Sequence, residues 1–209
     1  MQKLMLTAAV AIVSSTMFAQ GVGRKVFKPG ETGGEKVVEV RARDYNRSLE
    51  NSGTSIAPIA IGIGAFGLPY GREWAIRGAR INFGLPNWTA SYELVYGLDL
   101  GLSGETYGAA GGVLINAIEN TTCNMYGLSI AGLWNLAKGA DSAALQLAAV
   151  YNGAEKLDGA QIGLINIARE LHGVQLGIFN QAVNGSGLQI GIWNNSGRGV
   201  GSPILGFIY

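Results

Sequence analysis

Three copies of one phrase, Gly159-Ala-Gln-Ile-Gly-Leu-Ile-Asn166, Gly173-Val-Gln-Leu-Gly-Ile-Phe-Asn180 and Gly187-Leu-Gln-Ile-Gly-Ile-Trp-Asn194, follow one another near the C-terminus. Their common pattern is G-φ-Q-φ-G-φ-φ-N, where φ is an apolar residue, and it recurs every fourteen residues. Repetition at a fixed period indicates an architecture built from one structural unit. The repeat therefore decides the fold class.

Imperfect copies extend the pattern towards the N-terminus. Gly127-Leu-Ser-Ile-Ala-Gly-Leu-Trp-Asn135 and Ala144-Leu-Gln-Leu-Ala-Ala-Val-Tyr-Asn152 each carry one additional residue, and Gly97-Leu-Asp-Leu-Gly-Leu102 is truncated. The terminal asparagines, at 120, 135, 152, 166, 180 and 194, are fourteen to seventeen residues apart. Charged residues gather between the copies. We expect residues 55–209 to form one repeat-built β domain.

The repeats predict strands and not helices. Each phrase has Gly at two of eight positions, and an interior Gly costs a helix about 1 kcal/mol relative to Ala. Val174, Leu176 and Ile178 alternate with Gln175, Gly177 and Phe179. Period-two alternation is the signature of a strand with two different faces. One face is predicted to be uniformly aliphatic.

Two all-β architectures fit this pattern. The favoured one is an antiparallel meander that closes into a small β-barrel of about 8–10 strands, with the aliphatic face towards lipid and the Gln and Gly positions towards a packed lumen. The alternative is a parallel β-solenoid of 14–17-residue rungs, in which Gln and Asn stack in ladders. The barrel is preferred because fourteen residues leave little room for a turn after a straight strand. Aromatic residues near the strand ends would form interfacial girdles or pack in the core: Tyr92, Tyr96, Trp134, Tyr151, Phe179 and Trp193.

Composition limits the classes of function. Only 14% of the 209 residues are charged and the net charge is +1, which argues against an extended nucleic-acid surface. The single cysteine, Cys123, excludes an internal disulfide framework and a cysteine-based zinc site, and we expect it to be a small buried hydrophobe.

The N-terminus predicts export. Lys3 precedes an apolar run from Leu4 to Val13, and small residues lead to Ala19, the pattern of a secretory signal peptide over residues 1–19. Residues 20–54 are rich in charges of both signs and glycine, and we expect a solvated, partly flexible segment.

No catalytic, cofactor-binding or metal-binding residue is predicted, and we expect no enzyme activity. Gly62-Ile-Gly-Ala-Phe-Gly67 is a formal G-x-G-x-x-G, but a turn-like Leu68-Pro-Tyr-Gly71 follows where a dinucleotide site needs a helix. His172, beside Glu170, is predicted to be a surface turn residue. Arg80 and Asp99 lie in apolar strands and are expected to form an interior ion pair or to face solvent.

The alternating Leu205, Phe207 and Tyr209 resemble the C-terminal recognition strand of bacterial outer-membrane barrels. That resemblance implies outer-membrane lipid and the barrel assembly machinery as partners. The G-φ-Q-φ-G-φ-φ-N units, from about Gly78 to Tyr209, resemble a largely uncharacterised family of Gram-negative bacterial surface-repeat proteins. The family implies an envelope location. We therefore expect a non-enzymatic outer-membrane or cell-surface protein with a structural or adhesive role, or alternatively a secreted solenoid that binds a polymer or protein partner along its repeats.

Overall fold

The structure, a computed structural model, describes residues 55–71, 73–197 and 201–209. The predicted signal peptide and the charged 20–54 segment lie outside these residues. The described residues form strands and no helix. The strands are β1 (Ile56–Ile63), β2 (Phe66–Leu68), β3 (Ala75–Phe83), β4 (Tyr92–Ala131), β5 (Trp134–Ala137), β6 (Ala143–Ala148), β7 (Tyr151–Ile162), β8 (Ile165–Leu176), β9 (Phe179–Asn195) and β10 (Gly201–Ile208).

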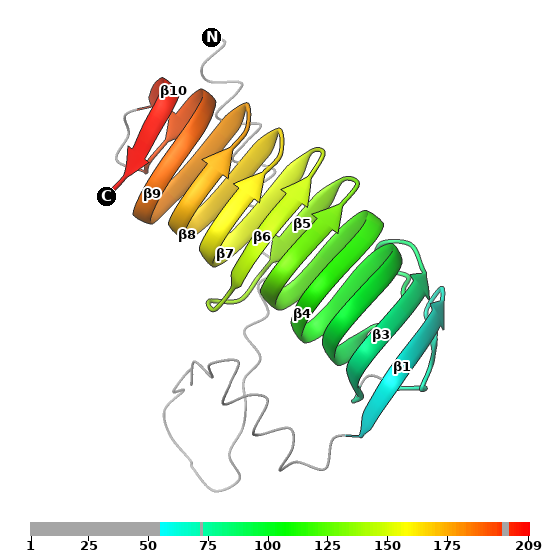
Figure 1. Cartoon of the computed structure of the whole chain (residues 1–209). Coiled ribbons are helices and arrows are strands. Elements are labelled where there is room, and N and C mark those ends of the chain that lie inside the picture. The colour runs from blue at the N-terminus through cyan, green and yellow to red at the C-terminus, as the bar shows by residue number, and fades with distance from the viewer. Residues whose placement is uncertain (1–54, 72, 198–200) are drawn as a thin grey trace, which may run out of the picture. The chain divides into compact units, whose positions relative to one another are not determined.

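Consecutive repeats pair in parallel, so the predicted barrel is wrong and the alternative, a parallel β-solenoid, is confirmed (Figure 1). In the β7–β8 ladder Gln161 lies opposite Gln175, and Asn166 lies opposite Asn180 in the β8–β9 ladder. Each repeat is therefore one coil of a continuous stack. The sheet order is β10-β9-β8-β7-β5-β4-β3-β1-β2, and β6 pairs with β4 and β7.

The barrel prediction fails because the eight-residue phrase is not one straight strand. β7 ends at Ile162 and β8 begins at Ile165, so Gly163 and Leu164 form a corner inside the phrase. The chain turns within two residues and needs no separate connection. Alternation is also broken at this corner, which brings both Gln161 and Asn166 to the inside of the coil.

Two amide ladders run along the inside of the coils. Asn152 donates through Nδ2 to Oδ1 of Asn166 (2.9 Å), and the same bond joins neighbouring coils down the stack from Asn120 to Asn194. Gln161 donates through Nε2 to Oε1 of Gln146 (2.8 Å), and Gln175 and Gln189 continue this ladder. All these side chains are buried. Parallel in-register stacking therefore gives each amide an identical partner, which satisfies its buried polar atoms.

Apolar side chains fill the rest of the narrow interior. Ala154, Ala168 and Ala182 stack in one inward column, and Leu157 and Leu171 in another, with all five fully buried. Gly173 (φ +148°) lies where the coils approach most closely, because a Cβ there would overlap the carbonyl oxygen of Gly159. The interior therefore consists of columns of like residues.

Short strands close the two ends of the stack. β10 pairs antiparallel with β9, and the predicted C-terminal strand is thereby confirmed as a strand. At the other end β1 pairs in parallel with β3, and β2 folds back antiparallel on β1. The G-x-G-x-x-G stretch is this β1–β2 hairpin, with Gly64 (φ +57°) in its turn.

Candidate functional site

One side of the coils carries two adjacent rows of outward-pointing aliphatic residues. Ile162, Leu176 and Ile190 pair in register in neighbouring coils, and Ala160, Val174 and Leu188 form the second row. The rows continue through β6 and β4 to β1, and end on β10. We call this surface the aliphatic face; it comprises Ile59, Ile61, Ala79, Ile81, Leu98, Leu100, Val113, Ile115, Leu128, Ile130, Leu145, Leu147, Ala160, Ile162, Val174, Leu176, Leu188, Ile190, Leu205 and Phe207. The predicted aliphatic face is thus present, on the outside of a solenoid.

The aliphatic face is open. Ile115, Ile162 and Ile190 lie in the middle of the sheet with a strand on either side, yet remain 40%, 37% and 39% exposed. With strands about 4.8 Å apart, the face measures roughly 40 Å by 15 Å, or about 600 Å². This is the upper end of the largest apolar patch on a typical soluble monomer. Exposed apolar residues at the adjoining corner enlarge it further: Ile63, Phe83, Leu102, Leu164, Ile178 and Ile192.

Aromatic side chains border the aliphatic face beyond that corner. Trp134 pairs with Tyr151, and the column continues through Ile165 to Phe179. Trp193, one coil further, is 44% exposed. Burial raises the pKa of Tyr151 to about 12. Of the aromatics predicted near strand ends, Trp134, Phe179 and Trp193 form this border, whereas Tyr92 and Tyr151 are buried.

A mixed polar row borders the other long edge. It contains Tyr96, Tyr126, Asp158 and His172, each directly before the glycine that opens its coil. Tyr126 donates its hydroxyl proton to the carbonyl oxygen of Asp141 (2.7 Å), and burial, with the Asp141 carboxylate, raises the pKa of its phenol.

Charged residues lie at the corner beyond this row and pair with one another. Glu170 is 2.9 Å from Lys156 Nζ and 3.1 Å from His172 Nε2, and these hydrogen bonds lower the pKa of its carboxyl. Arg169 pairs with Glu155. The surface position of His172 is confirmed, although it lies within strand β8, and its Nδ1 contacts Ser186 Oγ (2.9 Å). These contacts are those of an exposed structural cluster.

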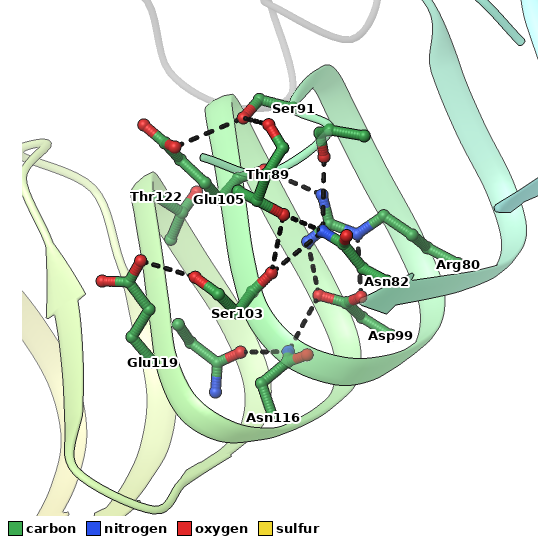
Figure 2. Close-up of polar contacts among 12 residues, drawn as sticks. Arg80, Asn82, Thr89, Ser91, Asp99, Ser103, Glu105, Asn116, Glu119 and Thr122 are labelled. Atoms are coloured by element: carbon green, nitrogen blue, oxygen red, sulfur yellow. Dashed lines mark hydrogen bonds and ion pairs between the residues drawn. The ribbon is translucent and has the colours of Figure 1, made fainter. Parts of the chain in front are cut away.

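The first coils enclose a buried polar network (Figure 2). Arg80 donates from Nε and Nη2 to the two carboxylate oxygens of Asp99 (2.8 and 2.6 Å), and from Nη1 to the carbonyl oxygen of Glu105 (2.7 Å). Asn116 adds a bond to Asp99 (3.2 Å). Both charged side chains are shielded from solvent. The predicted interior ion pair is confirmed, and the Asp99 carboxylate is closed off from any substrate.

The other carboxylates of these coils are also held by hydrogen bonds. Glu119 accepts from Ser103 Oγ (2.6 Å) and from Trp134 Nε1 (2.7 Å), and Glu105 accepts from Ser91 (3.3 Å). Within the described residues no three His, Cys, Asp or Glu side chains are grouped so that they could hold a metal ion. We expected Cys123 to be fully buried, but it is half-buried. Its partial burial raises the pKa of its thiol.

No family model, curated protein or solved structure matches the chain. Among the described residues, no helix is long and apolar enough to span a bilayer. In the part of the chain that the structure describes, the aliphatic face is an outward surface of one chemical kind that runs along the coils. The Gln and Asn of the repeat and the Arg80–Asp99 pair point inward and hold the coils together, whereas His172 and Glu170 pair with their neighbours at the surface.

Proposed function

We propose that the chain is a non-enzymatic binding protein that docks along its repeats through the aliphatic face. The observation that carries the proposal is the uninterrupted aliphatic surface, which no described residue covers. Transfer of about 600 Å² of apolar surface out of water contributes on the order of 15 kcal/mol before the costs of association are subtracted. Such a face favours a bound state over free solution.

The proposed setting is the bacterial envelope or the exterior of the cell. Residues 1–19 carry the export pattern, and the repeats resemble surface-repeat proteins. Parallel stacking favours the role of a secreted or surface solenoid that binds along its repeats over that of a barrel wall. Recognition of Leu205, Phe207 and Tyr209 by the assembly machinery stays a prediction. In the structure, Leu205 and Phe207 belong to β10, the strand that closes the stack.

The test compares the wild-type chain with a face-charged triple variant, Ile115→Glu, Ile162→Glu and Ile190→Glu, each produced at full length for cell fractionation and from Gln20 onward for sedimentation. These positions lie in well-separated coils, so that the introduced charges do not stack. Val183→Glu is the matched control, since Val183 is also an exposed aliphatic residue of β9 but lies outside the face.

We expect the wild type and Val183→Glu to fractionate with the envelope or, in detergent-free buffer, to sediment as assemblies. The triple variant should be a soluble monomer in sedimentation velocity and retain the β circular dichroism spectrum. A wild-type protein that neither fractionates with the envelope nor assembles, and is indistinguishable from the triple variant in both respects, would contradict the proposed function.

A further inference from the structure

We infer that the partner of the aliphatic face is the acyl region of a single lipid leaflet, on which the solenoid lies flat without crossing it. This inference rests on the proposed function and specifies its partner. It follows from the chemistry of the face, its translational repetition and the distribution of polar groups around it.

The chemistry of the face suits a fluid apolar phase better than a folded protein. Every member is Ala, Val, Ile, Leu or Phe, so none offers a side-chain donor or acceptor. Typical protein–protein interfaces carry about ten direct hydrogen bonds, which fix their orientation. The backbone groups of the face are paired between neighbouring coils, except at the outer edge of β10 and along the first part of β1. Between these ends the sheet can therefore contact hydrocarbon without leaving backbone N–H or C=O groups unsatisfied.

Translational repetition argues against a second copy of the chain as the partner. Ile162, Leu176 and Ile190 are near-equivalent in successive coils. A partner solenoid shifted by one coil, about 4.8 Å, would therefore bury almost the same surface. A lipid leaflet requires no register, so this ambiguity does not weaken its binding.

The border of the face matches the layering of a leaflet. Trp134, Phe179 and Trp193 lie along one long edge, and Tyr96 and Tyr126 along the other. Trp and Tyr concentrate at the headgroup level of membrane proteins, where one end of the ring is apolar and the other wet. Arg77, Asp158 and His172 stand in the same row as these tyrosines, at headgroup level. Lys156 and Glu170 lie further out, where they would remain in water. The arrangement is that of an interfacial protein with its apolar face a few ångströms below the headgroups.

The test is flotation of the mature chain with phosphatidylcholine vesicles, which carry no net charge. We expect the wild type and Val183→Glu to float with the vesicles and the face-charged triple variant to lose about tenfold or more of its partitioning, since each Glu would have to enter hydrocarbon. Flotation should persist in about 1 M NaCl, because the face is uncharged and salt screens only electrostatic attraction. Salt resistance separates this mode from attraction through the charged residues of the 20–54 segment.

Failure of the inference and failure of the proposed function give different results. If the wild type forms a defined dimer that the triple variant disrupts, and does not float with vesicles, the lipid inference is overturned and docking through the face stands. If the wild type neither floats nor assembles, both are overturned. Equal flotation of the wild type and the folded triple variant would also refute the face as the lipid contact.

Discussion

The coils of β7, β8 and β9 and the coils of β3 and early β4 fill the same inward column with different chemistry. In the later coils it holds Gln161, Gln175 and Gln189; in the earlier ones it holds Arg80 and Asp99. A carboxamide both donates and accepts, so identical residues can continue a ladder through any number of coils. An ion pair is complete with two members. The comparison indicates that the amide ladders form the repetitive body of the solenoid, whereas the ion pair belongs to its irregular beginning.

The ladders also differ in direction and in how they end. The Asn side chains donate towards the C-terminus, whereas the Gln side chains donate towards the N-terminus. At the C-terminal end Gln189 Oε1 is buried without a hydrogen-bond partner. At the N-terminal end Gln146 Nε2 meets only the Met125 sulfur, a weak acceptor. The interior of the Gln ladder is therefore better satisfied than its ends.

The largest effect should come from breaking the ion pair. Asp99→Ala leaves the Arg80 guanidinium buried and uncompensated, which should lower the free energy of unfolding by about 3–5 kcal/mol. Arg80→Met combined with Asp99→Leu should recover part of that loss, because it removes both charges. Urea denaturation followed by circular dichroism measures both, with the exposed Asp158→Ala as the control. A loss below about 1 kcal/mol for Asp99→Ala would mean that solvent reaches this site.

A break in the middle of the Gln ladder should cause the next largest loss in the free energy of unfolding. Gln175→Leu removes the donor to Gln161 Oε1 and the acceptor of Gln189 Nε2, two buried groups on opposite sides. Each unsatisfied group costs about 1–3 kcal/mol. Because Gln189 Nε2 keeps its bond to the Asn195 carbonyl oxygen (3.3 Å), we expect a loss of about 2–4 kcal/mol in the same denaturation experiment.

The same substitution at the end of the ladder should cost less. Gln189→Leu removes the donor to Gln175 Oε1 and a longer bond to the Asn195 carbonyl oxygen (3.3 Å), together with an oxygen that already has no partner. We expect a loss of about 1–2 kcal/mol. Equal losses for Gln175→Leu and Gln189→Leu would show that the ladder does not act as a chain of coupled bonds.

The smallest expected effect is at the exposed charged corner. Hydrogen bonds from Lys156 and His172 hold the pKa of Glu170 below its ordinary value. A depressed carboxyl pKa contributes stability that is present above the unfolded-state pKa, about 4.5, and is lost as the pH falls through the folded-state value. Glu170→Gln should therefore slightly lower the melting temperature at pH 7 and leave it unchanged near pH 3. An equal shift at both pH values would contradict the ion pairing.

Part of this structure could be read from the sequence. Alternation predicted the aliphatic face correctly, because it depends only on period two. It did not distinguish a barrel from a solenoid, since both use alternating strands and the corner at Gly163-Leu164 is as apolar as its surroundings. The inward orientation of Arg80 and Asp99 could have been predicted from their spacing. Each stands two residues after a glycine, Gly78 and Gly97, as Gln161 does after Gly159. The contacts of Glu119 with Ser103 and Trp134 depend on side-chain geometry between coils, which no spacing encodes.

The parallel stacking of the repeats is tested most directly by two cysteine pairs, each introduced with Cys123→Ala. The solenoid pairs Ile162 with Leu176 on adjacent coils, whereas an antiparallel meander joined through residues 167–172 would place Ile165 opposite Val174. Disulfides require Cα atoms about 4.4–6.8 Å apart. We predict that Ile162→Cys with Leu176→Cys cross-links efficiently under mild oxidation, and that Ile165→Cys with Val174→Cys does not. The opposite result would contradict the solenoid and, with it, the outward aliphatic face.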